Sequence, residues 1–224
     1  LLAYVDAEKL HAIGVDDDEG SPRLNELLDD VHAGRASARA GECGAARPKH
    51  RCDTDVEIAT RYAMRLLDRI DVRGAHARRI ELLQGDMTAL APGEGFDLLV
   101  VSAFPGDYTP TPGSLIGALQ RKGLSVQALS QDMAVDLRDA YASWVSNAFD
   151  MPDADLRFHR VLCFEPRERG RPPERVGDIF RALTPILAEA PEIRTVALPL
   201  IATGDQGYDV DEMLTPLLDA AIQW

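Results

Sequence analysis

Short apolar runs alternate with amphipathic stretches along the last two thirds of the chain. Each run is continuous and bounded by charged residues, Gly or Pro, which is typical of a buried strand. The runs cover residues 80–83, 96–104, 158–164 and 195–202. Helical spacing of apolar residues predicts helices at 114–120, 137–149, 173–190 and 210–223. This alternation predicts a three-layer α/β/α sandwich around a mixed, largely parallel central sheet.

The first third of the chain has a different pattern. Apolar residues recur at three-and-four spacing over residues 24–31 and again over 56–70, behind a plausible helix cap at Thr54. We therefore expect residues 1–78 to form a helical N-terminal extension and residues 79–224 to form the α/β domain. In the predicted helix 137–149, Trp144 lies on an apolar face with Tyr141, Val145 and Ala148, which favours packing in the core.

Composition and charge exclude several classes of protein. The 224 residues include 24 basic and 37 acidic side chains, a net charge of −13, which disfavours nucleic-acid binding. The chain is 46% hydrophobic and 27% charged, as expected of a globular protein rather than a disordered one. Its apolar runs are much shorter than the roughly 20 residues that cross a bilayer, so no membrane contact is expected.

Cysteine content and the N-terminus give further expectations. The three cysteines cannot form a complete disulfide framework, which indicates a reducing, cytoplasmic compartment. Cys43, His50 and Cys52 lack the Cys-x-x-Cys spacing of a zinc site, so no metal is expected, and no cofactor is required. The chain begins at Leu1 rather than Met, which favours a module cut from a larger protein with fused partner domains.

The segment from Thr195 to Tyr208 carries the strongest functional signal. An apolar strand ends in a turn that contains Gly204 and Gly207, and a helix follows directly. Glycines leave backbone N–H groups uncovered, and ligands of open α/β sheets bind at the carboxyl ends of strands. The turn therefore predicts an anion site for a phosphate or diphosphate that needs no lysine. A tight turn that uses glycine only for its shape is the alternative.

A second candidate segment, Gly85-Asp86-Met87-Thr88, ends the strand at 80–83. The Asp86 carboxylate can accept hydrogen bonds from an exocyclic amine, such as that of adenine, in a loop partly closed to water. In the alternative interpretation, Asp86 and Thr88 only cap the turn between two strands.

The order of these motifs resembles the macrodomain family over residues 79–224. Strand-Gly-Asp-Met-Thr is followed by Phe-Asp-Leu-Leu-Val-Val-Ser, a Gly-bearing loop with a helix, and Val-Ala-Leu-Pro-Leu-Ile-Ala-Thr-Gly-Asp-Gln-Gly-Tyr with a terminal helix. Macrodomains are α/β/α modules that bind ADP-ribose and related NAD-derived nucleotides, and some hydrolyse ADP-ribosyl linkages. The resemblance implies that Asp86 recognises adenine, that residues 203–208 wrap the diphosphate and distal ribose, and that Tyr208 packs against a ribose. The ligand-binding residues expected from it are Asp86, Met87, Gly113, Ser114, Thr203, Gly204, Asp205, Gln206, Gly207 and Tyr208.

The chain departs from the hydrolytic macrodomains in one loop. Those proteins carry Asn-Ala-Ala-Asn where this chain has Val101-Ser102-Ala103-Phe104, and their following glycine run is replaced here by residues 105–114 with three prolines. Gly113 and Ser114 still precede a helix and can present amides to a phosphate. Loss of the asparagine argues against the common hydrolase mechanism and leaves Asp107 as the candidate base, the alternative being a solvated loop residue.

Three functions follow for this chain. The leading expectation is a signalling module that binds or senses ADP-ribose or a related NAD-derived adenine nucleotide. The second is an ADP-ribosyl hydrolase. The third is a protein-interaction domain with a degenerate pocket, filled by its own side chains such as Phe104 or Tyr108.

Overall fold

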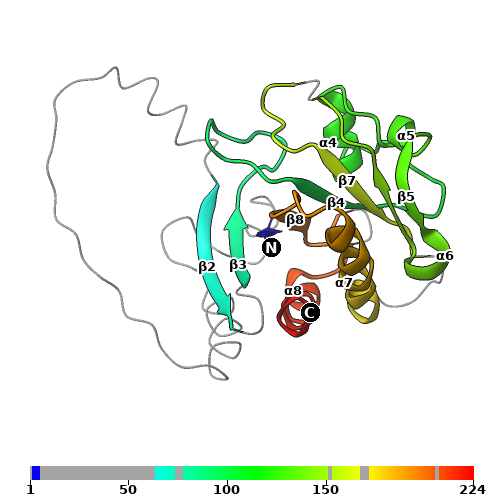
Figure 1. The fold of residues 1–224 in the computed structure, drawn as a ribbon. Coiled ribbons are helices and arrows are strands. Elements are labelled where there is room, and N and C mark those ends of the chain that lie inside the picture. Colours follow the sequence, from blue (N-terminus) through cyan, green and yellow to red (C-terminus); the bar gives the residue numbers. More distant parts are fainter. Residues whose placement is uncertain (1, 6–63, 74–77, 151–152, 167–171, 205–206) are drawn as a thin grey trace, which may run out of the picture.

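A computed structural model describes residues 2–5, 64–73, 78–150, 153–166, 172–204 and 207–224. The strands within these residues form one mixed sheet in the order β2-β3-β1-β8-β4-β7-β6-β5 (Figure 1). Their bounds are β1 Leu2–Val5, β2 Arg65–Val72, β3 Arg78–Gln84, β4 Leu98–Ser102, β5 Met133–Leu137, β6 Ser143–Ser146, β7 Arg160–Phe164 and β8 Val196–Pro199. Strands β3, β1, β8, β4 and β7 run parallel, whereas β2, β6 and β5 each run antiparallel to a neighbour.

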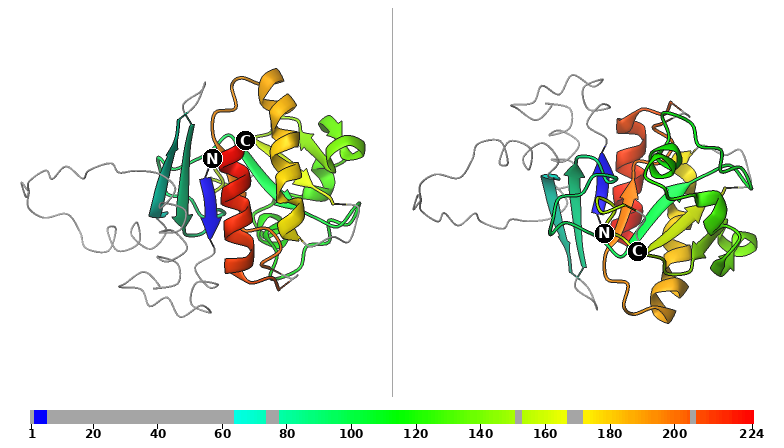
Figure 2. Two further views of the ribbon diagram at one scale, coloured as in Figure 1. Left: turned by 90° about the horizontal axis from the view of Figure 1, so that it is seen from below. Right: turned by 90° about the horizontal axis from the view of Figure 1, so that it is seen from above.

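Helices cover both faces of the sheet, as the alternating pattern predicted (Figure 2). Their bounds are α4 Leu115–Arg121, α5 Val126–Leu129, α6 Arg138–Tyr141, α7 Pro172–Glu189 and α8 Val210–Gln223. Successive residues of a strand point to opposite faces. Leu98 and Val100 of β4 therefore pack in one core with α7 and α8, and Leu99 and Val101 pack in a second core with α4 and α5. The α/β fold class expected from the sequence is confirmed.

Two segments assigned to the helical extension are strands instead. Strand β1 lies between β3 and β8, and β2 pairs with β3, so the helix predicted up to residue 70 is wrong from residue 65 onward. Pairing across the sheet outweighs the helical spacing, and Arg69 and Glu81 on facing strands form an ion pair of 2.8 Å. The remaining helix predictions, at 24–31 and 54–63, lie outside the described residues.

The helix predicted at 137–149 is also wrong. This region forms the end of β5, the short helix α6 and the strand β6, whose four residues are all buried. Trp144 is fully buried in the core, as expected, but it projects from a strand to one face while Val145 projects to the other. A strand covered on both faces has a continuous apolar pattern, and the same residues also fit a helix stripe.

The other predicted elements are confirmed. Helix α8 has the predicted bounds, α7 differs by one residue at each end, and the four predicted strands contain or overlap β3, β4, β7 and β8.

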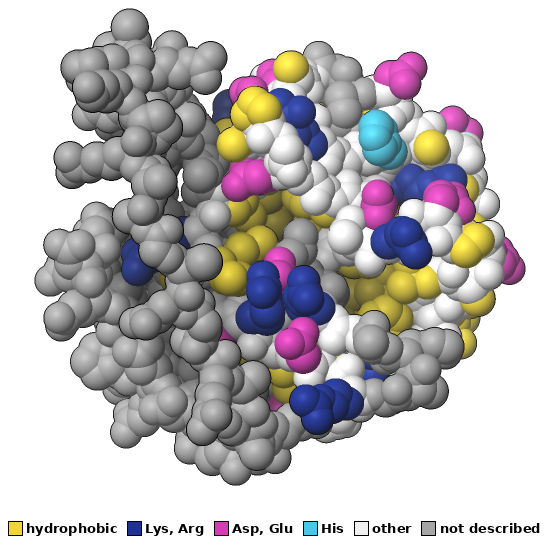
Figure 3. Space-filling view, turned by 60° about the vertical axis from the view of Figure 1, so that its left-hand side comes forward, with side chains coloured by type: hydrophobic (Ala, Val, Ile, Leu, Met, Phe, Trp, Pro, Cys, Tyr) yellow, Lys and Arg dark blue, Asp and Glu magenta, His cyan; other side chains and the backbone are white. Residues whose placement is uncertain are grey.

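Among the described residues, none of the helices combines the length and apolar character that a membrane crossing requires. Basic and acidic side chains are interspersed on the face shown in Figure 3, where apolar side chains line a hollow.

Candidate functional site

The loops that the sequence marks for ligand binding leave the same edge of the sheet. Leu83 of β3 pairs with Tyr4 of β1, and Tyr4 pairs with Pro199 of β8, so these parallel strands end level with one another. Leu99 of β4 pairs with Ala197 of β8, which brings the end of β4 to the same edge. Neighbouring strands lie about 4.8 Å apart, so the exits of β3 and β8 are separated by about 10 Å within the sheet.

The loop from 200 to 209 connects β8 to α8 and is held by its own backbone. Tyr208 N–H donates to the carbonyl of Ala202 at 3.1 Å, and Gly207 N–H donates to that of Gly204 at 2.9 Å. The loop therefore uses the amides of residues 207 and 208 internally, as donors to its own carbonyl groups. Ala202 has a φ of 66°, a left-handed conformation that costs a residue with a Cβ about 1 kcal/mol.

The side chains of this loop differ in their surroundings. Thr203 is 8% exposed and its hydroxyl donates to the carbonyl of Leu200 at 2.7 Å. Tyr208 is half-buried against the core that contains α7 and α8. Asp205 and Gln206 lie outside the described residues. Three carboxylates, from Asp209, Asp211 and Glu212, stand at the start of α8, where they occupy the positive end of the helix dipole.

The exit of β3 contains an Asx turn. The Oδ1 atom of Asp86 accepts hydrogen bonds from the backbone N–H of Thr88 at 2.8 Å and from its hydroxyl at 2.7 Å. Asp86 itself is exposed, so the turn displays its carboxylate to solvent. Met87 is 2% exposed and belongs to the core, so only its backbone is available to a ligand.

The loop from 103 to 114, between β4 and α4, begins with a tight turn. Asp107 N–H donates to the carbonyl of Phe104 at 2.9 Å, and Gly106 has a φ of 71°. Proline at the second position and a left-handed glycine at the third define a type II turn, Phe104-Pro105-Gly106-Asp107. One of the three prolines of this loop, Pro105, therefore shapes its first turn.

The end of this loop caps α4. The Ser114 hydroxyl accepts the N–H of Gly117 at 3.0 Å and donates to the carbonyl of Thr111 at 3.1 Å. Its side chain therefore serves as the N-cap, whereas Gly113 is exposed beside it. Because the hydroxyl is engaged in this way, any contribution of Ser114 to ligand binding rests on its backbone.

A buried carboxylate that the sequence analysis missed stands directly after β7. Glu165 is 3% exposed. Its Oε1 atom accepts the hydroxyl of Tyr108 at 2.5 Å and the indole N–H of Trp144, and its Oε2 atom accepts the Gly106 N–H at 3.3 Å. We call this group, Glu165 with Tyr108, Trp144 and the Gly106 amide, the Glu165 clasp. It ties the type II turn to β6 and β7, and the signal for it was an acidic residue immediately after a continuous apolar run.

The clasp changes the ionisation of its neighbours. Burial, followed by the hydrogen bond to Glu165, raises the pKa of Tyr108 to about 12. Burial raises the pKa of the Cys163 thiol well above its ordinary value, and the charge of Glu165 adds to this effect. Both groups are therefore neutral at pH 7, and Tyr108 acts as a hydrogen-bond donor.

We expect Tyr108 to make folding sensitive to alkaline pH. The unfolded chain loses the tyrosine proton near pH 10 and the folded chain near pH 12, so stability from this group is complete below pH 10 and is lost as pH rises towards 12. Urea unfolding measured across that interval should show a steeper fall for the wild type than for Tyr108→Phe. Equal slopes for the two proteins would contradict the assignment.

The pKa of Asp107 is shifted in the direction that makes the carboxylate a poorer general base. Its carboxylate accepts the hydroxyl of Thr109 at 2.7 Å and the backbone N–H of Thr109 at 3.0 Å, and these bonds hold its pKa below the usual value. A carboxylate with a lowered pKa is a weaker proton acceptor, because an effective base has a pKa near the working pH.

Within the described residues, no group of three His, Cys, Asp or Glu side chains is arranged to hold a metal ion, and Cys43, His50 and Cys52 lie outside them.

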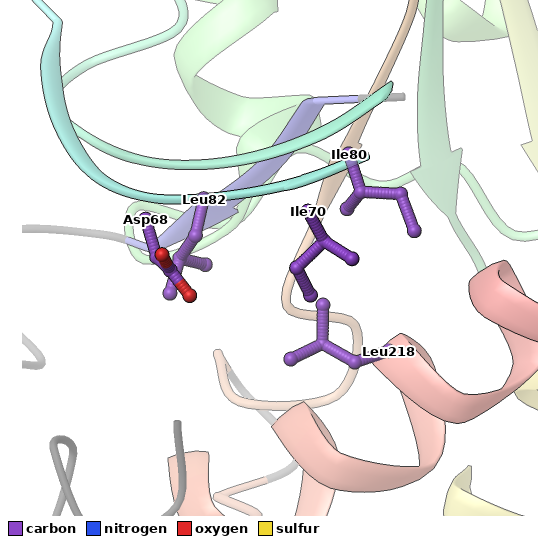
Figure 4. A pocket seen from close by; sticks show the side chains of 5 residues that line it. All are labelled: Asp68, Ile70, Ile80, Leu82 and Leu218. Atoms are coloured by element: carbon purple, nitrogen blue, oxygen red, sulfur yellow. The ribbon is translucent and has the colours of Figure 1, made fainter. Parts of the chain in front are cut away.

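A recess elsewhere in the molecule has a different lining. It lies between strands β2 and β3 and helix α8 and is lined by Asp68, Ile70, Ile80, Leu82 and Leu218 (Figure 4). Four of these five side chains are aliphatic, so the recess offers nothing to a phosphate. The loops at the carboxyl edge of the sheet remain the candidate site.

The fold and this edge define an α/β protein whose parallel strands present their loops along one side. No family model and no curated protein matches the sequence. Among solved structures, the chain is similar in fold to the Oceanobacillus iheyensis macrodomain with MES bound, at 17% sequence identity, over 70% of this chain and 81% of that chain, with a TM-score of 0.49.

Proposed function

We propose that the carboxyl edge of the sheet binds ADP-ribose or a related NAD-derived adenine nucleotide, as a binding or sensing module of a larger protein. The observation that carries the proposal is the level register of β3, β1, β8 and β4, which brings the exits of separate motifs to one edge. Ligands of open α/β sheets bind at such an edge.

Each loop has a distinct part in this proposal. The Oδ1 atom of Asp86 accepts two hydrogen bonds from Thr88. Its Oδ2 atom would accept a hydrogen bond from the exocyclic amine of adenine. The turn at Thr203 and Gly204 follows β8, the strand next to β1, and would lie beside the diphosphate. Gly113 and Ser114 contribute backbone groups from the neighbouring loop. Asp205, Gln206, Gly207 and Tyr208 complete the proposed lining.

An ADP-ribosyl hydrolase is the weaker proposal. Its candidate base is Asp107, and the hydrogen bonds from Thr109 lower the pKa of that carboxylate. The interaction-domain proposal with Phe104 filling the pocket is also weaker, because 63% of the Phe104 surface is exposed. Tyr108 is buried, but it is directed to Glu165.

Calorimetric titration with ADP-ribose tests the proposal. We expect saturable binding that Asp86→Asn weakens by roughly 10- to 100-fold, the value of a hydrogen bond to a charged group. Asparagine keeps an oxygen for the two Thr88 donors but replaces the second acceptor with a donor, so it separates turn formation from adenine recognition. Gly204→Glu should abolish binding, because it adds a side chain and a negative charge beside the phosphates.

Gln223→Glu is the matched control for Gly204→Glu. It adds the same charge on an exposed residue at the other end of α8, about 20 Å away along a helix of 14 residues. It should leave the affinity unchanged. Absence of heat with millimolar ADP-ribose, or equal effects of the two glutamates, would contradict the proposed site.

A further inference from the structure

An aromatic side chain is held in solvent at the proposed binding edge. Phe104 is 63% exposed and lies two residues after β4. Leu66, at 46%, is the other exposed large hydrophobic side chain within the described residues. Burial of a Phe side chain is worth roughly 2 kcal/mol, so a phenylalanine kept in water forgoes a substantial contribution to stability.

The backbone around Phe104 is fixed from both sides. Its own carbonyl accepts the Asp107 N–H at 2.9 Å in the type II turn, and Ala103 N–H donates to the carbonyl of Phe164 at 3.0 Å. Beneath the turn, the Gly106 amide donates to Glu165 at 3.3 Å. The ring is therefore attached to a preorganised support, and a ligand that contacts it has little backbone entropy to remove.

The same turn carries an acidic residue. The backbones of Phe104 and Asp107 form an isolated antiparallel bridge, so the ring and the carboxylate project from neighbouring positions of one turn. The hydrogen bonds from Thr109 lower the pKa of Asp107, and the carboxylate therefore stays ionised at neutral pH. The face of an aromatic ring is also electronegative. Both groups favour a cation.

The strand order places this pair at one end of the proposed ligand. Along the edge, the exit of β3 with Asp86 comes first, then the loop after β8 with Gly204, and then the loop after β4 with Phe104. A dinucleotide bound with adenine at Asp86 and its diphosphate at Gly204 extends its remaining end towards Phe104. A phenylalanine has no hydrogen-bonding group for sugar hydroxyls, but it stacks on planar rings.

Resting on the proposed function, we propose that Phe104 and Asp107 form a subsite for a positively charged planar ring at the end of the ligand remote from adenine. The pyridinium ring of oxidised NAD has this chemistry. ADP-ribose lacks the pyridinium ring, and the ring of reduced NAD has no positive charge. All three compounds share the adenine and diphosphate groups, so differences in their affinities report the contributions of the ring and of its charge.

Calorimetric affinities for oxidised NAD, reduced NAD and ADP-ribose test the subsite. We expect the wild type to bind oxidised NAD about 10-fold more tightly than ADP-ribose, from stacking and cation–π attraction. Reduced NAD should bind with intermediate affinity, because its ring can stack but carries no positive charge. Phe104→Ala should bring the three affinities together, and Phe104→Trp should preserve the preference. Asp107→Asn should reduce it several-fold, because the asparagine oxygen still accepts from Thr109 while the charge is lost.

Leu66→Ala is the control, since it removes the other exposed apolar side chain, from β2 at the far end of the sheet. It should leave the preference unchanged. If the wild type binds none of the three compounds, the proposed function fails and the subsite fails with it. If ADP-ribose binds as tightly as oxidised NAD, or if Phe104→Ala leaves the preference intact, the subsite alone is wrong.

Discussion

Gly117→Ala is expected to destabilise the protein by about 3 kcal/mol or more, because the new methyl group has no space. An added Cβ would lie 1.8 Å from the carbonyl oxygen of Thr111 and 2.9 Å from its carbonyl carbon. Both are backbone atoms, so helix α4 and the loop before it would have to separate. The Ser114 cap, which bonds both Gly117 and Thr111, would be lost in that movement.

Gly177→Ala provides a matched control within a helix. Gly177 lies in α7, and apart from its chain neighbours and the adjacent backbone of the helix, no atom lies within 4 Å of an added Cβ there. Alanine is the better helix former, so this variant should gain about 0.5–1 kcal/mol. Urea unfolding of the three proteins at neutral pH measures both effects. A Gly117→Ala protein as stable as the wild type would show that α4 does not pack against the loop as described.

Glu165→Leu is expected to cost about 2–4 kcal/mol of stability. The substitution leaves the Tyr108 hydroxyl and the Trp144 indole N–H buried without an acceptor, at about 1–3 kcal/mol each. Removal of a buried carboxylate offsets part of this cost, because a charge inside the protein has itself lost hydration. The cost of the two unpaired donors exceeds this gain, so the net effect of the substitution is a loss of stability.

A double-mutant cycle isolates the clasp. In a Tyr108→Phe background, Glu165→Leu orphans one side-chain donor fewer, so its cost should fall by about 1 kcal/mol or more. Glu165→Gln keeps one acceptor oxygen and should fall between wild type and Glu165→Leu. Additive costs in the cycle would contradict a shared hydrogen-bond group.

The local sequence pattern was sufficient to predict an element and its bounds where that element has one exposed and one buried side. Helix α8 is such an element, and its bounds from Val210 to Gln223 agree with the prediction. Pattern failed where long-range pairing decides the structure. The four residues of β1 are too few to show a period, and they become a strand because residues 81–84 and 197–199 flank them. Strand β6 has both faces covered, which removes the alternation that would have distinguished it from a helix.

The candidate site was likewise predictable from the sequence in part. Parallel strands share one carboxyl edge, so the sequence was sufficient to place the loops at residues 85 and 204 on the same side. The internal use of the amides of Gly207 and Tyr208 depends on loop conformation, which composition does not reveal. The Glu165 clasp joins residues 57 and 21 positions apart, and no local pattern encodes such a meeting.

The central position of β1 has a consequence for biosynthesis. Its partner on one side, β3, is made early, but its partner on the other side, β8, is made much later, since Leu2 pairs with Ala197. Contacts between such distant residues form slowly because a long chain segment must first be closed into a loop. The edge of β1 that faces β8 therefore stays unpaired at least until Pro199 has been made, and an unpaired strand edge can pair with another chain during that interval.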